Sequence, residues 1–258
     1  MDTSKAGVDG TLTSRYECKY FVSEQVASEI RQYVRPFLSL DPYSEKSESH
    51  QYSVYSLYFD SPGFRLYQDT IEGARNRFKL RLRYYDEAGE GPVFAEVKKR
   101  NDQIVRKTRD RLDVAALAEV GTGQVHAISN EFMERVLAVG ARPTMRIRYR
   151  REAWECRGNS PVRITFDTQL EHSLPISPGL RDECAAWEPT PLEGVILEIK
   201  FTQMRPLWLN QMIAHFQLDK RSIAKYVMSV DSARDSGEIM HHFARTAVTP
   251  NWQHSALR

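Results

Sequence analysis

Cysteine is scarce in this chain of 258 residues, and the few cysteines form no recognisable set. Cys18, Cys156 and Cys184 are an odd number and lie far apart, without CxxC spacing. This argues against a disulfide framework and against a cysteine zinc site. We expect the thiols to be reduced and inert.

Long apolar runs are missing as well. No stretch approaches the roughly 18 to 20 apolar residues that a membrane span needs. The N-terminal segment, MDTSKAGVDGTLTSRYE, lacks the apolar core of a secretory signal. We therefore expect a soluble, cytoplasmic protein with no membrane span in this chain.

The motifs of several enzyme classes are also absent. The chain has no Walker A and no GxGxxG sequence, so any nucleotide would be held through its phosphates and not by a P-loop. Without a GxSxG sequence, a nucleophile elbow has no support. Lys plus Arg (36) and Asp plus Glu (34) nearly cancel, and the net charge of +2 does not by itself predict a polyanion partner.

Strand-like runs make up most of what is present. Eight runs are rich in β-branched and aromatic residues, most with alternating apolar and polar positions. They cover residues 16–22, 52–60, 77–85, 93–99, 104–112, 144–150, 161–167 and 195–201. Eight strands are enough to close a barrel. We predict an α+β fold built on a closed, eight-stranded antiparallel β-barrel with flanking helices.

Helical periodicity is confined to a few segments. Ser23 can cap a helix with Val26, Ile30, Tyr33 and Val34 on one face. Further helices are expected at 113–120, 130–139, 207–216 and 222–233. We expect one folded domain over residues 14–233, with a disordered lead at 1–13 and a loosely attached tail at 234–258.

Charged residues alternate with apolar ones inside the strands. In the run FKLRLRY at 78–84, Lys79, Arg81 and Arg83 share one face and the apolar residues form the other. When a single strand has this pattern, its charged face is ordinarily on the side of an antiparallel sheet that faces water. However, E-x-K pairs repeat the pattern on three other strands, and this recurrence favours a shared interior. The pairs are Glu17 with Lys19, Glu96 with Lys98, and Glu198 with Lys200.

If these faces turn inward, the lumen holds nine cations against three carboxylates. The cations are Lys19, Lys79, Arg81, Arg83, Lys98, Lys107, Arg109, Arg163 and Lys200, and the carboxylates are Glu17, Glu96 and Glu198. Crowded like charges in a partly desolvated space repel one another, so this lumen needs a polyanion. Arginine forks and lysine ammonium groups suit phosphate, and the carboxylates can hold Mg²⁺ or Mn²⁺ that bridges phosphate oxygens. Such a set suits phosphoryl transfer.

Two aspartates and the aromatic residues receive other roles. Asp60 and Asp167 lie at strand ends, where a structural role is expected over a place in the lumen. The aromatic residues fall mainly on the strand face opposite the cations. Single-stranded nucleic acid would require aromatics interleaved with the cations, so we do not expect it as a partner.

Several stretches resemble the VTC (vacuolar transporter chaperone) polyphosphate polymerase domain, within the CYTH-like triphosphate tunnel metalloenzyme superfamily. The matches run in order over nearly the whole folded unit, and SLYFD, RLRYY and ITFDT would seldom occur together by chance. They are RYECKYFV (15–22), YSVYSLYFDS (52–61), RFKLRLRYY (77–85), AEVKKR (95–100), YRREAW (149–154), VRITFDT (162–168), LEIK (197–200) and AKY (224–226).

The resemblance implies a tunnel that takes ATP, transfers its γ-phosphate to a growing polyphosphate chain and releases ADP. By position, Arg151 joins the phosphate-binding cations, and Lys225 closes on the phosphates from a helix after the last strand. We therefore predict catalytic roles for Arg81, Arg83, Lys225 and Glu198. Substrate binding is predicted for Lys19, Lys79, Lys98, Lys107, Arg109, Arg151, Arg163 and Lys200, and binding of Mn²⁺ or Mg²⁺ for Glu198, Glu17 and Glu96.

The sequence departs from the family pattern in the first strand and in the terminal S-K-[YF] element. Glu17-Cys18-Lys19 is short of the E-x-E-x-K of tunnel triphosphatases, and Ala224 stands where a hydroxyl is usual. Hydrolysis of tri- or polyphosphate, and non-catalytic binding of polyphosphate or inositol phosphates, stay open as alternatives. The better-known relatives carry this domain beside an SPX domain and membrane helices. We expect neither of these in this chain, so a membrane-protein partner would be a separate polypeptide.

Arg151 also presents a difficulty of alternation. The run MRIRYRR at 145–151 groups Arg146, Arg148 and Arg150 on one face, whereas the resemblance selects Arg151. A bulge or strand end near Arg150 would reconcile the two. Arg146 and Arg148 would then face solvent.

Overall fold

The computed structural model describes residues 15–86, 91–102, 104–112, 130–156, 161–175, 186–202 and 204–239. The lead expected at 1–13 and the helix expected at 113–120 lie outside these residues, as does most of the expected tail.

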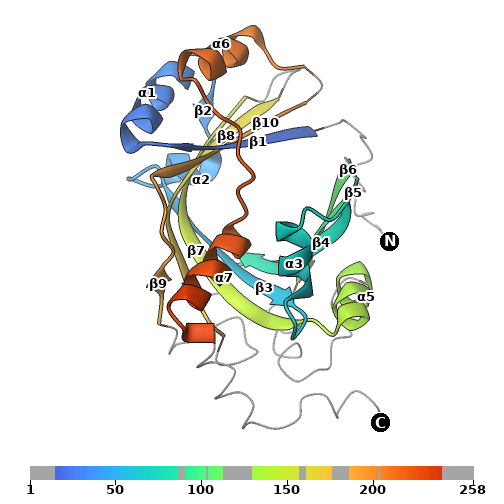
Figure 1. The fold of residues 1–258 in the computed structure, drawn as a ribbon. Coiled ribbons are helices and arrows are strands. Elements are labelled where there is room, and N and C mark those ends of the chain that lie inside the picture. Colours follow the sequence, from blue (N-terminus) through green and yellow to red (C-terminus); the bar gives the residue numbers. More distant parts are fainter. Residues whose placement is uncertain are drawn as a thin grey trace, which may run out of the picture.

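One antiparallel sheet of ten strands forms the body of the protein (Figure 1). Its main path runs β1-β10-β8-β7-β3-β4-β5-β6, and two short strands pair beside it, β2 with β7 and β9 with β8. The strands are β1 (Arg15–Val22), β2 (Ser39–Leu40), β3 (Tyr52–Asp60), β4 (Asn76–Tyr84), β5 (Val93–Asn101), β6 (Ile104–Leu112), β7 (Arg142–Glu155), β8 (Val162–Ser173), β9 (Glu188–Pro189) and β10 (Val195–Thr202). All eight predicted strands are thus confirmed as strands.

The prediction of a closed, eight-stranded barrel is wrong. The sheet has ten strands, and within the described residues β1 and β6, the two ends of its path, do not pair with each other. The free edge of β1 is partly occupied, because the Arg221 N–H donates to the Lys19 carbonyl at 2.8 Å. Side chains nevertheless bridge the two ends of the curled sheet, where Lys98 Nζ on β5 lies 3.1 Å from Glu17 Oε2 on β1.

Helices pack against both faces of the sheet (Figure 1). They are α1 (Glu24–Val34), α2 (Pro42–Lys46), α3 (Arg65–Ile71), α5 (Asn130–Val139), α6 (Leu207–His215) and α7 (Lys225–Asp235). Ser23 caps α1 as predicted, since its Oγ accepts from the Val26 N–H at 3.2 Å. The short helices α2 and α3 were not predicted, because five and seven residues are too few for a clear helical period.

Three apolar clusters form the core. The first lies between α1, α6 and the convex face of β1, β10 and β8, with Ile30, Leu209 and Ile199 at its centre. The second joins α3 and α5 to the convex face of β3, β4 and β5. The third lies on the concave side, where α7 packs on β7 and β3. Helix α7 therefore covers an apolar part of the concave face and leaves the charged part uncovered.

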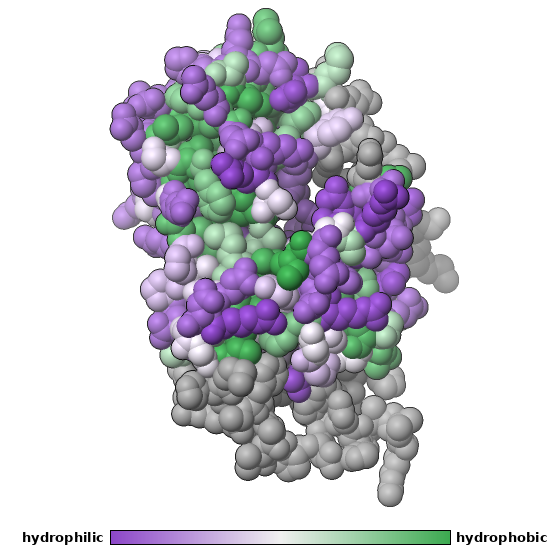
Figure 2. Space-filling view, in the orientation of Figure 1, coloured by the Kyte–Doolittle hydropathy of each residue, from purple (hydrophilic) through white to green (hydrophobic). Residues whose placement is uncertain are grey.

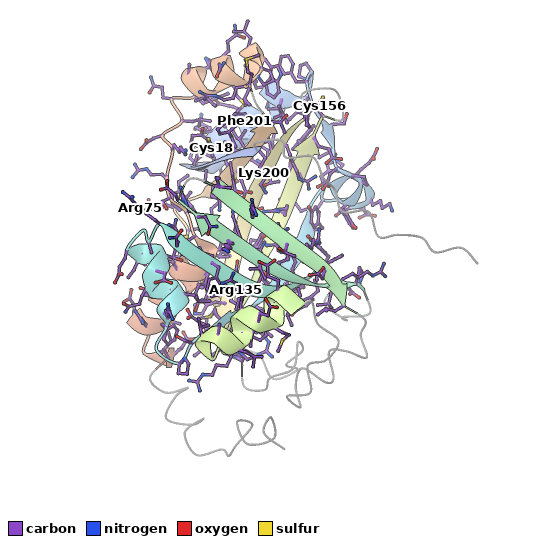
Figure 3. The ribbon with its side chains drawn as sticks, turned by 90° about the vertical axis from the view of Figure 1, so that its right-hand side faces the viewer. Cys18, Arg75, Arg135, Cys156, Lys200 and Phe201 are labelled. Carbon is purple, nitrogen blue, oxygen red and sulfur yellow. The ribbon has the colours of Figure 1, made fainter. Side chains whose placement is uncertain are left out.

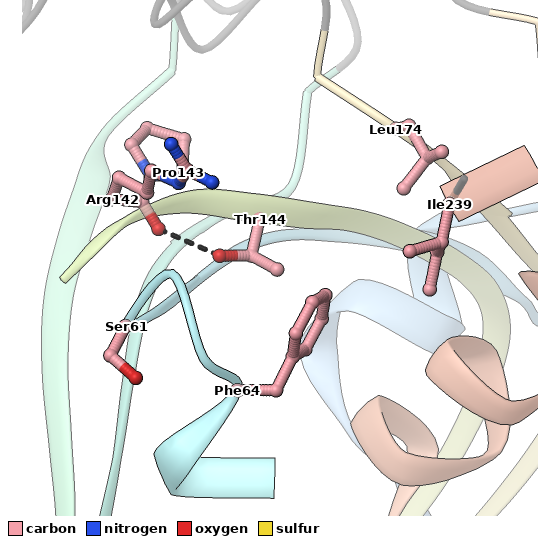
Figure 4. Close-up of a pocket in the computed structure, with 7 residues that line it drawn as sticks. All are labelled: Ser61, Phe64, Arg142, Pro143, Thr144, Leu174 and Ile239. Atoms are coloured by element: carbon pink, nitrogen blue, oxygen red, sulfur yellow. Dashed lines mark hydrogen bonds between the residues drawn. The ribbon is translucent and has the colours of Figure 1, made fainter. Parts of the chain in front are cut away.

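The fold continues beyond the domain boundary expected at residue 233. Helix α7 extends to Asp235, and Ile239 is buried in the third cluster. Ile239 helps to line a cavity of about 20 Å³ beside Phe64 and Thr144 (Figure 4). This volume holds no more than a water molecule, so the cavity is a packing defect and not a ligand site.

Candidate functional site

The charged face predicted from the sequence lies on the concave side of the sheet. Residues that pair across neighbouring strands project to the same side, and the registers connect all the predicted strand residues into one surface, here called the cationic face. Its cations are Lys19, Lys79, Arg81, Arg83, Lys98, Lys107, Arg109, Arg151, Arg163 and Lys200, and its predicted carboxylates are Glu17, Glu96 and Glu198. Figure 2 shows hydrophilic side chains on both sides of the notch between the ends of β1 and β6.

Arg151 reaches this face by ordinary alternation along β7. It pairs with Tyr52 of β3 and with Asp167 of β8. The register does shift between Arg148 and Arg150, where β8 contains an extra residue. The expectation that Arg146 faces solvent is wrong: its side chain is on the convex face, which the second apolar cluster covers, and it is 1% exposed.

Arg148 is not a solvent-facing cation either. It forms a paired contact with Glu171 of β8, in which Nε lies 2.7 Å from Oε2 and Nη2 lies 3.0 Å from Oε1. Both side chains are half-buried on the convex face. Alternation alone could not reveal this, because the partner belongs to a different strand.

Glu96 is the centre of a four-cation cluster. Its carboxylate lies 2.6 Å from Arg81 Nη2, 2.7 Å from Lys107 Nζ, 3.3 Å from Arg109 Nε and 4.0 Å from Arg83 Nε. Burial would raise the pKa of Glu96, but the surrounding cations outweigh burial and hold this pKa well below its usual range. With 1% of the side chain exposed, Glu96 acts as the internal counter-ion of the cluster.

Glu17 and Glu198 form a second centre around Lys19. Lys19 Nζ lies 3.3 Å from Glu17 Oε1 and 3.9 Å from Glu198 Oε2. Lys200 Nζ lies 2.5 Å from the other oxygen of Glu198. Burial and Glu198 would raise the pKa of Glu17, yet Lys19 and Lys98 lower it to about 2. Figure 3 shows Lys200 on the side of β10 that is turned toward the green strands β5 and β6.

Asp167 belongs to the site, although a structural role was expected for it. Its two oxygens accept from Arg151 Nε and Nη2 at 2.7 and 2.8 Å. Lys225, the first residue of α7, lies 2.6 Å from the same carboxylate. Arg163, Thr165 and Asp167 alternate along β8, and this alternation is the signal in the sequence that places Asp167 on the same face as Arg163. Asp60 has the expected structural role, since it accepts from the Leu66 and Tyr67 N–H groups that begin α3.

Tyr58 was missed by the sequence analysis. Its hydroxyl accepts from Arg81 Nη1 at 3.0 Å, and its ring stacks on Tyr226 of α7 at 5.0 Å. Burial would raise the pKa of Tyr58, but Arg81, Arg83 and Lys79 outweigh it and lower the pKa to about 8. Tyr58 thus connects α7 to the cationic face.

Lys79 has no hydrogen bond or ion pair within the described residues, in contrast to the other cations of this face. Burial, opposed by Tyr58 and reinforced by the neighbouring Lys19 and Lys98, lowers its pKa to about 8. Burial similarly lowers the pKa of Lys107 to about 8 despite its contact with Glu96.

Positive charge exceeds negative charge among the predicted residues of the site and their charged contacts. The ten strand cations and Lys225 make eleven. The three predicted carboxylates make six together with Asp167, Glu155 and Asp41, the last two of which bind Arg163 at 2.5 and 2.6 Å. A surplus of five positive charges in a partly desolvated concavity favours a polyanionic ligand.

Residues 14–234 match the VTC domain family. The chain belongs to this family. The family predicted from the sequence is therefore confirmed.

The chain is also similar to individual proteins of known sequence or structure. Vacuolar transporter chaperone complex subunit 4 of Schizosaccharomyces pombe is 21% identical, over 92% of this chain and 39% of that protein, so the chain spans about two fifths of the relative. A Bacillus halodurans protein described as a candidate adenylate cyclase has a TM-score of 0.48 at 12% identity, covering 81% of this chain and 92% of that chain. A Pyrococcus horikoshii OT3 protein has a TM-score of 0.45 at 14% identity, and the match covers 86% of this chain and 98% of that chain.

Two of the three predicted metal ligands of this VTC domain suit a divalent cation. Glu17 and Glu198 flank Lys19. Thr165 pairs across the strands with Glu198, and its Oγ1 is buried with no hydrogen-bond partner among the residues that the structure describes. No group of three or more metal-binding side chains occurs in the described part of the chain. A metal here would take its other ligands from phosphate and water, as Mg²⁺ commonly does. No helix in the described ranges is both long and apolar enough to cross a membrane.

Proposed function

We propose that this VTC domain is a metal-dependent phosphotransferase that moves the γ-phosphate of ATP onto a growing polyphosphate chain. The observation that carries the proposal is the cationic face, with its surplus of five positive charges drawn from seven strands and α7. Phosphoryl transfer depends mainly on positioning and charge neutralisation, which such a face supplies. Membership of the VTC family supports the same assignment.

In the proposed reaction a terminal oxygen of the polyphosphate attacks the γ-phosphorus of ATP. A new P–O bond forms, the bond to the β-phosphate oxygen breaks, and ADP leaves. The attacking oxygen is already anionic, so the domain needs no nucleophile of its own and no general base. Arg81 and Arg83 stabilise the charge of the transferring group, and Lys225 contacts it from the N-terminus of α7.

We propose that Glu17 and Glu198 hold Mn²⁺ or Mg²⁺ next to the phosphates. When held there by Glu17 and Glu198, the ion would supply neutralisation of the phosphate charge. Glu96 is left out of this metal site, because four cations within 4.0 Å would repel a further positive ion. We propose ATP and polyphosphate as the ligands and a cytoplasmic location.

The test is incubation of the purified domain with ATP and Mn²⁺, followed by assay for acid-labile polymer, ADP and orthophosphate. Polymer with an equivalent amount of ADP supports the proposal. Orthophosphate in place of polymer would assign hydrolysis, and tight binding of polyphosphate without turnover would assign a binding module. The incomplete E-x-E-x-K of β1 favours transfer over hydrolysis.

A further inference from the structure

One end of the cationic face is aromatic. Tyr52 at the start of β3, Tyr85 after β4 and Phe94 at the start of β5 lie on the concave side, and Tyr43 of α2 packs against them. Ring centroids are 5.5 Å apart for Tyr43 and Tyr52, 5.9 Å for Tyr43 and Tyr85, 6.1 Å for Tyr52 and Tyr85, and 6.4 Å for Tyr85 and Phe94. These four residues are here called the aromatic collar.

The aromatic collar is continuous with the phosphate-binding cations. Arg109 connects the two, because its guanidinium lies 3.7 Å from the Phe94 ring centroid and donates to the Tyr85 hydroxyl at 3.3 Å, while its Nε contacts Glu96. Across the strands, Phe94 is the partner of Arg83 and Tyr52 is the partner of Arg151. A ligand that occupies the cations can therefore reach the rings without leaving the face.

The collar is also accessible. Tyr43 is 61% exposed, and Tyr52, Tyr85 and Phe94 are half-buried. A single exposed aromatic residue is unremarkable, but four in mutual contact form an apolar surface that an unbranched phosphate chain cannot use. A polyphosphate that ends in a flat aromatic group can use both surfaces at once.

We propose that the aromatic collar stacks the base of a nucleoside triphosphate whose phosphates extend onto the cationic face. The proposal rests on the function proposed above and adds the position of the nucleoside. Tyr43 and Tyr85 already contact each other, with planes 18° apart, so the base stacks on the exposed side of the collar and not between these rings. The γ-phosphate then points away from the collar.

Stacking also predicts the degree of base selectivity. Every base offers a π-face, so stacking tolerates different bases. The hydroxyls of Tyr52 and Tyr85 are engaged with Asp41 and Arg109. We expect ATP and GTP to bind with similar affinity.

The experiment compares ATP with inorganic tripolyphosphate by isothermal titration calorimetry in EDTA, where no turnover occurs. Tyr43→Ala is expected to weaken ATP binding about tenfold, the usual effect of losing one stacking ring, and to leave tripolyphosphate binding unchanged. Tyr43→Phe keeps the ring and should bind both ligands like the wild type. Tyr16→Ala, which removes an exposed ring on β1 outside the collar, should do the same.

The outcomes separate this inference from the proposed function. The collar proposal would be overturned if Tyr43→Ala weakened the binding of ATP and of tripolyphosphate equally, or did not weaken ATP binding. In either case, binding of tripolyphosphate by the wild type would still support the phosphate site. Failure of the wild type to bind either ligand would overturn the proposed function and the collar with it. A thermal unfolding midpoint for Tyr43→Ala equal to that of the wild type establishes that the variant is folded.

Discussion

Glu96 and Glu198 stand in the same E-x-K sequence but in different surroundings. Glu96 is shared by four cations, whereas Glu198 contacts two lysines and pairs across the strands with Thr165, whose hydroxyl has no hydrogen bond within the described part of the chain. A carboxylate that is already neutralised on all sides has little to offer a metal ion. The same short motif therefore supplies a counter-ion on β5 and a candidate metal ligand on β10.

Glu198→Gln is expected to remove metal-dependent turnover and to weaken Mn²⁺ binding at least tenfold, because a neutral amide is a poor ligand for a hard cation. Turnover is measured as ADP release, and Mn²⁺ binding by electron paramagnetic resonance. The fold should persist, since Gln keeps the size of Glu.

Glu171→Gln is the matched control for Glu198→Gln. Glu171 is a carboxylate on the convex face of the adjacent strand β8, paired with Arg148 and far from the cations of the site. This variant should retain turnover and Mn²⁺ binding. If Glu198→Gln bound Mn²⁺ with the affinity of the wild type, Glu198 would not be a ligand of the metal.

At the scale of elements, Asp60 connects three parts of the chain. It ends β3, accepts from the Leu66 and Tyr67 N–H groups of α3, and accepts from the Tyr226 hydroxyl of α7 at 2.7 Å. Tyr226 stacks on Tyr58 and directly follows Lys225. The carboxylate thus holds the helix that presents Lys225 to the cationic face.

Asp60→Ala is expected to lower the free energy of unfolding by about 3 kcal/mol, because it leaves buried N–H donors without an acceptor. Urea denaturation followed by circular dichroism measures the change. Glu72→Ala is the control, since Glu72 is exposed at the other end of α3 and should change stability little. Equal stability of the two variants would contradict the assigned role of Asp60.

At the scale of the whole molecule, the crowding of positive charge predicts opposite effects of pH on binding and on stability. Lys79 and Lys107 have pKa values of about 8, below the ordinary value for lysine. As pH rises through 8 these lysines lose charge, so the affinity for tripolyphosphate should fall between pH 7.5 and about 9.5. A bound polyanion favours the protonated lysines, so binding takes up protons in this range.

The unliganded protein should instead gain stability over the same pH range. Above pH 8 the unfolded chain holds more protons than the folded chain, because the pKa of each lysine is higher when unfolded, and stability rises with pH wherever this holds. Titration calorimetry from pH 7 to about 9.5 measures affinity, and thermal melts measure stability. Lys79→Arg, which stays charged, should bind tripolyphosphate with a weaker pH dependence. A pH-independent affinity of the wild type would show that both lysines keep their charge.

Local sequence determined which segments became strands and which of their faces carried charge. In β4, period-two alternation placed Lys79, Arg81 and Arg83 on one face of the strand, independently of the rest of the chain. The E-x-K pairs behaved in the same way on β1, β5 and β10, and the stretches SLYFD, RLRYY and ITFDT carried the resemblance to the VTC family. Each of these features lies within one short segment, so neighbouring residues along the chain decide it.

Tertiary structure decided how these faces meet. The sheet stays open between β1 and β6, Asp167 joins Lys225, and the collar brings together Tyr43, Tyr85 and Phe94. None of this could be predicted, because such distances depend on strand register, on the curl of the sheet and on where α2 and α7 pack. Alternation specifies a side of a strand, whereas Coulomb energies and ring contacts depend on separations across strands, which only the folded chain defines.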